Sequence, residues 1–293
     1  MSEPLPPTEA VDAATAHLDT LTTHDLVETL VAANRIAVDA VIDAAPAIAA
    51  IVDVVVAALR EEKRLHYVGA GTSGRLAVLD AAELPPTFGV SPDLVRAHIA
   101  GGEAAMFRAI EGAEDDAAAG AALAQTFAAG DVVIGISASG GAPYVVAALA
   151  AARARGAVTI GIASVPNSKL LADVGIGIAL ATGPEPIAGS TRLKAGTAQK
   201  IVLNAISSAV MVQLGKVYGN LMVDVVATNA KLVRRAERLI HTILGDEVDA
   251  RAVLYAAGGN VKRGVVMHVL QVGIAQADAR LAACGGRLAE AIR

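Results

Sequence analysis

Aromatic side chains are nearly absent from this chain. Phe, Tyr and Trp make up 2% of its 293 residues, and Trp is missing altogether. A surface that binds nucleic acid by stacking bases on aromatic rings is therefore not expected. With 54% hydrophobic residues, the core has to be built from Ala, Val, Leu and Ile, which is typical of alanine-rich helices packed on buried parallel strands.

Cysteine is scarce and the net charge is modest. Cys284 is the only cysteine, so the chain can form neither an intrachain disulfide nor a thiolate metal cluster, which fits a reducing cytoplasm. The net charge of −5 disfavours a nucleic-acid partner. Residues 231–293 differ from the rest, because they carry 10 basic and 6 acidic side chains. We therefore expect a compositional boundary near Lys231.

Long uncharged runs are limited to one stretch. Residues 132–152 carry no charge over 21 positions, a length that raises the question of a membrane span. Turn-forming residues interrupt its middle, at Ser137, Ser139, Gly140, Gly141 and Pro143. The stretch thus predicts a strand, a loop and a helix, and we expect a soluble protein without a membrane partner. The first residues, MSEPLPPTEA, have neither a basic nor an apolar run, so no export signal is expected.

The order of hydrophobic patterns predicts an α/β fold. Apolar residues recur at helical spacing from Thr23 to Arg60, with Ala45-Pro46 as a break, which predicts two antiparallel helices. Five short β-rich runs follow, most of them separated by alanine-rich helical stretches: Leu65–Val68, Val95–Ile99, Val132–Ile136, Val158–Ile162 and Val174–Leu180. This alternation predicts a doubly wound parallel five-stranded sheet of flavodoxin-like type, with ligands at the carboxyl ends of the strands. A long helical segment is expected from Thr191 to Lys216, and short helices after Lys231.

The loop after the first strand has the spacing G-x-G-x-x-G. It reads Gly69-Ala70-Gly71-Thr72-Ser73-Gly74-Arg75. A dinucleotide site would also need an acidic residue at the end of the second strand, but Ala100-Gly101-Gly102 separates that strand from Glu103. Thr72 and Ser73 instead place hydroxyl groups where a helix N-terminus already favours an anion. A tight glycine turn with a Ser/Thr cap is the structural alternative.

The loop after the third strand repeats this arrangement. It reads Ile136-Ser137-Ala138-Ser139-Gly140-Gly141, and Pro143 suits the first turn of a following helix. Two such loops in one sheet indicate a site for a small phosphorylated polyol, because neither loop has the lysine of a Walker motif. A nucleotide is the less favoured alternative. The residues predicted to bind substrate are Gly71, Thr72, Ser73, Ser137, Ser139 and Gly140.

Two glutamates are candidates for acid–base chemistry. Glu83 comes directly before Leu84-Pro85-Pro86, and because a residue before proline is driven out of the α region, we expect the helix to end there. The helix dipole disfavours an anion at that end and so favours a protonated acid. Glu114 lies in the acidic run Glu111-Gly112-Ala113-Glu114-Asp115-Asp116, which also reads as the solvated start of an alanine-rich helix.

The sequence gives no support for metal or serine-nucleophile chemistry. The six histidines do not pair at metal-ligand spacing and are expected to be mostly surface or half-buried residues: His17, His24, His66, His98, His241 and His268. A Gly-x-Ser-x-Gly motif is missing as well. We therefore expect no metal site.

Three segments are distinctive: GAGTSGRLAVLDAAELPPTFG, EGAEDD and GPEPIAGSTRLKAGTAQKIVLNAISSAVMVQLGKVYGNLMVDVVATNAKLVRRAERLI. Together they resemble the N-acetylmuramic acid 6-phosphate etherases, a family of the sugar-isomerase-domain (SIS) superfamily. The similarity runs from Thr8-Glu9 to the C-terminal GGNVKRGVVMHVL. It implies N-terminal helices in residues 1–60, a sugar-phosphate-binding SIS domain in 61–230 and a small helical subdomain in 231–293.

The resemblance also implies an activity. Members of this family are carbon–oxygen lyases that convert N-acetylmuramic acid 6-phosphate to N-acetylglucosamine 6-phosphate and D-lactate during cell-wall amino-sugar recycling. The family implies a cytoplasmic homodimer without a metal or organic cofactor, and Glu83 and Glu114 match its two active-site glutamates. The uncharged stretch Ile201–Gly215 is more apolar than one buried helix face requires, so we expect the segment 191–216 to contribute to the dimer interface.

Two carboxyl groups suffice for this chemistry. In the open-chain sugar, carbon 2 is alpha to the aldehyde, so a base can remove its proton while an acid protonates the departing lactyl oxygen on carbon 3. Water then adds to the unsaturated intermediate. We expect Glu114 to be the base and Glu83 to be the acid.

The chain departs from the family pattern in two places. Ser139-Gly140-Gly141-Ala142-Pro143-Tyr144 stands where the family usually has Ser-Gly-Arg-Thr-Pro-Tyr, so a cation and a hydroxyl are missing beside the second loop. This departure is expected to affect affinity or substrate range. Near the N-terminus, Asp12-Ala13 replaces the usual Asn-Pro.

Three other functions remain open at this point. A phosphosugar isomerase on the same fold would also need a carboxylate base and the hydroxyl loops. A non-catalytic sugar-phosphate-binding regulator would need only the loops, and the presence of both glutamates argues against it. An oxidoreductase would bind nicotinamide, which fluorescence on mixing can test.

Overall fold

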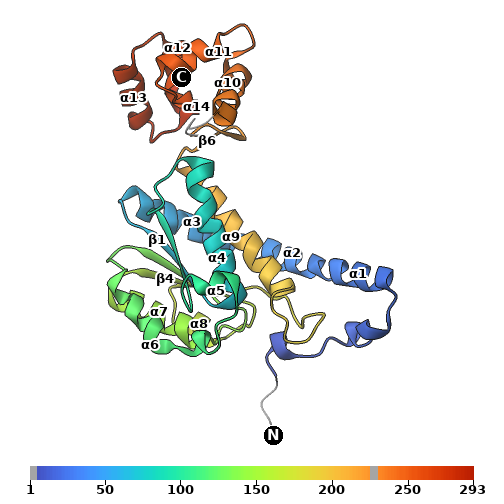
Figure 1. The fold of residues 1–293 in the computed structure, drawn as a ribbon. Helices are drawn as coiled ribbons and strands as arrows, with labels where there is room; N and C mark the ends of the chain where they lie inside the picture. The colour runs from blue at the N-terminus through green and yellow to red at the C-terminus, as the bar shows by residue number, and fades with distance from the viewer. Residues whose placement is uncertain (1–4, 225–229) are drawn as a thin grey trace. The chain divides into compact units, whose positions relative to one another are not determined.

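The computed structural model describes residues 5–224 and 230–293. Its central feature is a five-stranded, all-parallel sheet in the order β2-β1-β3-β4-β5 (Figure 1). The strands are β1 (Leu65–Gly69), β2 (Val95–Ile99), β3 (Val132–Ile136), β4 (Val158–Ala163) and β5 (Ile176–Ala179). The predicted doubly wound α/β fold is confirmed. Each predicted strand agrees to within two residues at either end.

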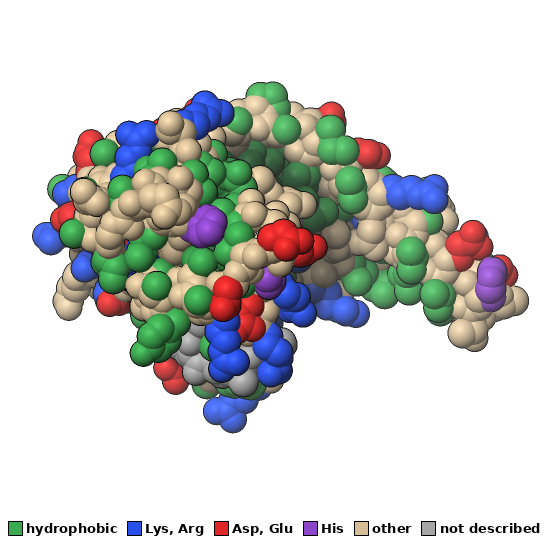
Figure 2. All heavy atoms as spheres, turned by 90° about the horizontal axis from the view of Figure 1, so that it is seen from above, with side chains coloured by type: hydrophobic (Ala, Val, Ile, Leu, Met, Phe, Trp, Pro, Cys, Tyr) green, Lys and Arg blue, Asp and Glu red, His purple; other side chains and the backbone are tan. Residues whose placement is uncertain are grey.

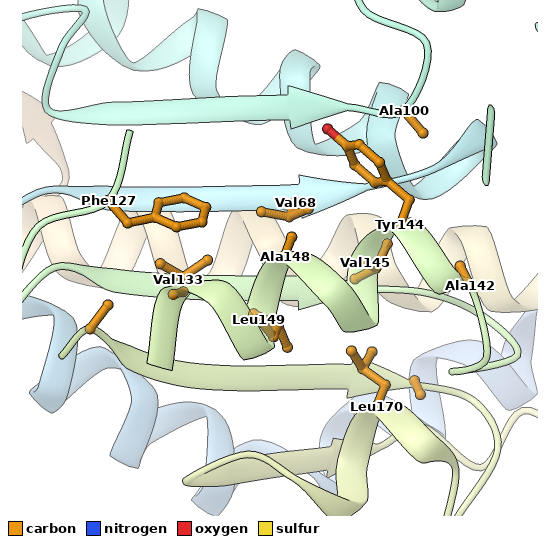
Figure 3. Packing of buried hydrophobic residues seen from close by; sticks show 13 residues of the cluster. Val68, Ala100, Phe127, Val133, Ala142, Tyr144, Val145, Ala148, Leu149 and Leu170 are labelled. Atoms are coloured by element: carbon orange, nitrogen blue, oxygen red, sulfur yellow. The ribbon is translucent and has the colours of Figure 1, made fainter. Parts of the chain in front are cut away.

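One face of the sheet is covered by helix α7 (Pro143–Ala154), whose apolar residues pack on β1, β3 and β4 (Figure 3). Close packing here depends on Gly135 in β3, because a Cβ at this position would lie 2.7 Å from Cδ1 of Leu149. Helix α6 (Ala117–Ala122) packs in turn on α7, and Gly120 allows the approach because a Cβ there would collide with the carbonyl oxygen of Tyr144. Small residues thus bring the helices down onto the strands.

Three long helices lie on the opposite face: α3 (Ala45–Arg60), α4 (Gly71–Phe88) and α9 (Lys194–Gln213) (Figures 1 and 3). Short elements complete the connections: η1 (Pro7–Glu9), η2 (Ala13–Thr15), η3 (Leu18–Thr20), α5 (Ala104–Phe107), η4 (Ala113–Asp115), η5 (Leu123–Gln125) and α8 (Lys169–Ala172). Many apolar side chains of α9 are buried within the chain, among them Ala195, Val202 and Ile206, whereas Val212 near its end is 50% exposed. A contribution of α9 to a dimer interface stays a prediction.

The N-terminal region contains three helices where two were predicted. Breaks at Ala33 and Ala44 separate α1 (Thr23–Ala32), α2 (Asn34–Asp43) and α3. No residue of α1 is buried, although it carries valines and leucines. Figure 2 shows apolar side chains standing among charged ones on this projecting pair of helices. None of the described helices is alone long and apolar enough to cross a membrane; only the pair 23–43 and 45–60, bent by 58°, reaches that length and composition jointly.

Helix α4 does not end at Glu83, as predicted, but continues through Pro85 and Pro86 to Phe88. Two prolines cost the helix backbone hydrogen bonds. Burial of Leu84 and Phe88, which are 4% and 9% exposed, compensates for this loss, because each apolar side chain removed from water contributes on the order of 2 kcal/mol. Gly89, with φ +63°, then ends the helix.

The chain forms two compact units, residues 1–82 with 93–207, and residues 83–92 with 208–293. The second unit contains the hairpin of β6 (Val217–Tyr218) and β7 (Leu221–Met222), with α10 (Ala230–Leu244), α11 (Ala250–Ala256), α12 (Val261–Leu270), α13 (Ile274–Ala283) and α14 (Leu288–Ala291). Here Asp224 accepts from the ammonium groups of Lys216 and Lys262, at 3.0 and 2.8 Å. The short helices predicted after Lys231 are confirmed, whereas the domain boundary at 231 stays a prediction.

Candidate active site

The loops after β1 and β3 begin side by side. Gly69 and Ile136 are register partners at the ends of these neighbouring strands, and the chain order of the sheet reverses between them. In open parallel sheets this position forms a crevice in which ligands bind. A cavity of about 290 Å³ lies here, and we call it the hydroxyl cavity. It is lined by Glu9, Ala70, Gly71, Thr72, Ser73, Glu114, Ser137, Ala138, Ser139, Ala142, Gly189 and Thr191.

Each glycine of the first loop has a physical role. A Cβ at Gly69 would lie 2.7 Å from the backbone nitrogen of Gly74, and a Cβ at Gly74 would lie 2.6 Å from Cγ1 of Ile99. These two glycines allow strand β1 and helix α4 to meet closely. Gly71 has φ +53°, a backbone conformation that side chains disfavour. The dinucleotide-like spacing therefore reflects a tight strand-to-helix turn.

Thr72 and Ser73 lie in the first turn of α4, where backbone N–H groups lack helical partners. Ser73 is 6% exposed, and its hydroxyl donates to Oε1 of Gln199 at 2.8 Å. Its oxygen keeps acceptor capacity on the cavity side, while Thr72 is half-buried. The helix dipole at this end favours a bound anion.

The second loop is held by its own serines. Ser137 Oγ accepts from the backbone N–H of Gly140 at 3.1 Å, and Ser139 Oγ accepts from Gly141 at 3.2 Å. Accepting these bonds leaves each hydroxyl hydrogen free to donate to a ligand. Gly140 has φ +67°, and a Cβ there would collide with Ser168. All six residues predicted to bind substrate lie at this place, although Gly140 itself does not line the cavity.

Two residues of the acidic run after the second strand, Glu114 and Asp116, have different positions in the structure. Gly112, with φ +69°, turns the chain into η4, and Glu114 from that turn lines the hydroxyl cavity. Asp116 instead caps α6, because its carboxylate accepts from the backbone N–H of Ala119 at 2.8 Å. The structure thus confirms a cap at Asp116 and places Glu114 at the cavity, where its catalytic role stays a prediction.

Glu83 is not among the residues that line the cavity. It lies on α4, twelve residues after Gly71, which corresponds to about 18 Å along the helix axis. The side chain is exposed. Because α4 continues to Phe88, Glu83 does not lie at the negative end of the helix dipole.

Six lining residues were not predicted as site residues. Ala70, Ala138 and Ala142 belong to the two loops or follow them directly, whereas Glu9, Gly189 and Thr191 come from elsewhere in the chain. In the sequence, these last three carry only the resemblance to a family. No hydrophobic period or loop motif marks them, since they reach the cavity through contacts distant in sequence. Among the described residues that line the cavity, none is Lys or Arg.

One histidine, His66, departs from the surface or half-buried position expected of most of the six. His66 and His98 stand on the neighbouring strands β1 and β2, and His66 Nδ1 lies 3.1 Å from His98 Nε2. Asp131 Oδ2 lies 3.4 Å from His66 Nε2. His66 is completely buried, and we call these three residues the histidine cluster. Strand register joins residues 32 positions apart, which sequence spacing cannot show.

Burial dominates the titration of both imidazoles. It lowers the pKa of His66, against the opposing charge of Asp131, and it lowers the pKa of His98 to about 4, with His66 and Arg96 acting in the same direction. His98 also lines a separate cavity of about 820 Å³ along strand β2, which contains no residue of the hydroxyl loops. Burial thus favours the neutral form of both imidazoles. A grouping of metal-ligand type on the described chain, His24, Asp25 and Glu28, is exposed on α1.

Comparison with known proteins agrees with this geometry. Residues 47–153 match the glucokinase regulatory protein N-terminal SIS domain, and residues 111–209 match the SIS domain. An N-acetylmuramic acid 6-phosphate etherase from Deinococcus radiodurans is 52% identical over 95% of this chain and 92% of its own. One from Gloeobacter violaceus is 51% identical over 97% and 94%. The structure of a phosphoheptose isomerase from Francisella tularensis, 16% identical, superposes with a TM-score of 0.51 over 65% of this chain and 98% of its own, which shows a shared fold.

Proposed function

The chain belongs to the N-acetylmuramic acid 6-phosphate etherase family, and we propose that the hydroxyl cavity is its active site. The protein is a carbon–oxygen lyase that cleaves the lactyl ether of N-acetylmuramic acid 6-phosphate in cell-wall amino-sugar recycling. The products are N-acetylglucosamine 6-phosphate and D-lactate. We place the enzyme in the cytoplasm, where its phosphorylated substrate and its unpaired Cys284 are both compatible with the environment.

One observation carries the placement of the site. The hydroxyls of both loops and the carboxylate of Glu114 line the same cavity. Thr72, Ser137 and Ser139 supply hydroxyl donors for a phosphate, together with the N-terminus of α4, where Ser73 lies. Anchoring the phosphate orients the sugar, and orientation of a reacting group is a major source of rate enhancement.

Glu114 is assigned as the base that removes the proton on carbon 2. Glu83 is assigned as the acid that protonates the departing lactyl oxygen. Because Glu83 is carried about 18 Å along α4 from Gly71, we assign it to the cavity of a second copy of the chain. The active site is then shared across a homodimer.

A homodimer also accounts for the exposed face of α1 and α2. Val27, Val31 and Ile42 are 53%, 67% and 63% exposed. An apolar face of this kind is typical of a protein–protein interface. We therefore propose that α1 and α2 contribute to the interface, beside the segment 191–216 expected from the sequence. Light scattering at micromolar concentration should give the mass of a dimer, and Val27→Glu with Val31→Glu should shift it toward the monomer.

Incubation with N-acetylmuramic acid 6-phosphate, followed by enzymatic measurement of D-lactate, tests the activity. An isomerase would convert phosphosugars without releasing lactate from this ether. A regulatory binding protein would bind the substrate in calorimetry without turnover. Stoichiometric D-lactate and N-acetylglucosamine 6-phosphate are the expected products, and their absence would reject the assignment.

A further inference from the structure

The strongest feature not used by this mechanism is the carboxylate of Glu9. We infer that Glu9 accepts hydrogen bonds from the hydroxyl groups of the bound sugar, and that it thereby selects a sugar phosphate over a bare phosphate ion. The inference rests on the proposed function of the hydroxyl cavity, which Glu9 and Glu114 both line.

The segment that carries Glu9 is held firmly in place. Thr8 is completely buried, and the 3-10 turn η1 is closed by the backbone N–H of Glu9, which donates to the carbonyl of Pro6 at 2.9 Å. Fixed φ angles at Pro6 and Pro7 restrict the turn further. The position of Glu9 at the cavity is therefore set by its neighbours and does not depend on its own side chain.

A glycine makes room for the carboxylate. Gly189 has φ +74°, and a Cβ at that position would lie 3.1 Å from Oε2 of Glu9. A Cβ at position 189 would therefore force the carboxylate to shift by a few tenths of an ångström. Within the described part of the chain, this carboxylate takes no hydrogen bond and no ion pair, so its acceptor capacity is available to a ligand.

The cavity lining offers two kinds of hydrogen-bonding group, one suited to the phosphate and one suited to the sugar. Hydroxyls and backbone N–H groups donate, and they suit the phosphate oxygens. An ionised carboxylate only accepts, so it repels a phosphate and suits the O–H groups of the sugar. Because no Lys or Arg is found among the described lining residues to neutralise Glu9, its charge has to be balanced by such donors.

The inference predicts that substitution of Glu9 affects the binding of a sugar phosphate and of inorganic phosphate differently. For Glu9→Ala, calorimetry should show affinity for N-acetylglucosamine 6-phosphate weakened about 10- to 100-fold, the range expected for loss of hydrogen bonds to a charged acceptor. Affinity for inorganic phosphate should stay the same or increase, because a repelling charge has been removed. Glu9→Gln keeps one acceptor oxygen and should lie between the wild type and Glu9→Ala.

Glu61→Gln is the matched control, since Glu61 is an exposed glutamate at the end of α3, before strand β1 begins. Its affinities for both ligands should match the wild type. In turnover, Glu9→Ala should raise KM for N-acetylmuramic acid 6-phosphate much more than it lowers kcat. Melting curves of both variants should overlay, because Thr8 anchors the segment.

Two outcomes would overturn the inference: unchanged affinity of Glu9→Ala for the sugar phosphate, or a parallel loss of affinity for both ligands. The second outcome would mean that Glu9 only shapes the cavity. A wild-type protein that releases no D-lactate would reject the proposed function instead. Calorimetry with the two ligands would still test Glu9 in that case, because it measures binding without turnover.

Discussion

The hydroxyl cavity and the histidine cluster both use strand β1, but they treat polar groups in opposite ways. In the cavity, Ser137 and Ser139 are held by local backbone N–H groups and keep donor capacity toward open space. In the histidine cluster, His66 lies between His98 and Asp131 with no exposure to solvent. Polar groups that remain available mark a binding site, whereas polar groups facing one another in the core mark a stability element.

This contrast makes a general prediction about the two regions. Substitutions in the cavity should change binding or rate with little effect on stability. Substitutions in the histidine cluster should change stability and its pH dependence, with little effect on binding.

The largest effects are expected from the two glutamates. Glu114→Gln and Glu83→Gln should each reduce D-lactate release about 10²- to 10⁴-fold, the usual contribution of a positioned acid or base. Proton removal at carbon 2 can occur and reverse without ether cleavage. Glu83→Gln should therefore still incorporate solvent deuterium at carbon 2, whereas Glu114→Gln should lose exchange and lactate release together. Mass spectrometry of recovered substrate measures the exchange.

Mixing the two inactive variants sharpens this test. If the active site is shared, random exchange of subunits should restore about a quarter of wild-type activity, because half the dimers are mixed and one site of each is intact. No recovery after verified exchange would place both glutamates in one chain. Exchange lost in Glu83→Gln and kept in Glu114→Gln would reverse their roles.

The loops and the sheet could be predicted because their signals are local. Strands β3 and β4 are short runs rich in Val and Ile, and each hydroxyl loop directly follows its strand, β1 or β3. Partners distant in sequence could not be predicted. Register brings His66 beside His98, tertiary contacts bring Glu9 to the cavity, and burial of Phe88 carries α4 through two prolines. The expectation that proline disfavours a helix is based on the local backbone alone. It cannot include the burial of Phe88, which stabilises α4 beyond the two prolines.

The histidine cluster should make stability depend on pH. Both imidazoles have a lowered pKa in the folded state, so between about pH 6.5 and pH 4 the unfolded chain binds protons that the folded chain does not. The unfolding free energy should therefore fall as the pH decreases through this range. A pKa of His98 lowered to about 4 corresponds to a decrease of about 3 kcal/mol in the unfolding free energy over this pH range.

The double variant His66→Leu/His98→Leu should lose this part of the slope in urea titrations at pH 7, 5.5 and 4.5. His17→Gln, at an exposed histidine, should keep the wild-type slope. KM of the double variant at pH 7.5 should remain close to the wild type, because neither imidazole lines the hydroxyl cavity. An unchanged slope would show that the imidazoles are not neutral in the fold.

Removing single hydroxyls should weaken binding moderately. Ser139→Ala should raise KM about 10-fold, the lower end of the effect of one lost hydrogen bond to an anion, while its melting temperature stays close to the wild type. Ser73→Ala should also reduce stability, because its partner Gln199 is buried and loses a donor. Ser208→Ala, an exposed serine of α9, is the control for both. Equal KM values for Ser139→Ala and this control would show that the Ser139 hydroxyl does not bind the phosphate.

The smallest effect is expected where the family pattern is restored. Gly141 is exposed, has no positive φ, and a Cβ there meets only Ser139 Oγ at 3.7 Å, so an arginine can be accommodated without strain. Ala142 is 9% exposed and lines the cavity, so the hydroxyl of a threonine at this position would lie within reach of a ligand.

Because the described lining lacks any cation, Gly141→Arg with Ala142→Thr should lower KM about 3- to 10-fold, as expected for one added charge-assisted contact near the surface. The gain should shrink at 0.5 M salt, which screens the arginine but not the serine hydroxyls. If KM stays the same or rises, side chains at these two positions do not touch the substrate, and the loop hydroxyls with the helix N-terminus are sufficient to hold the phosphate.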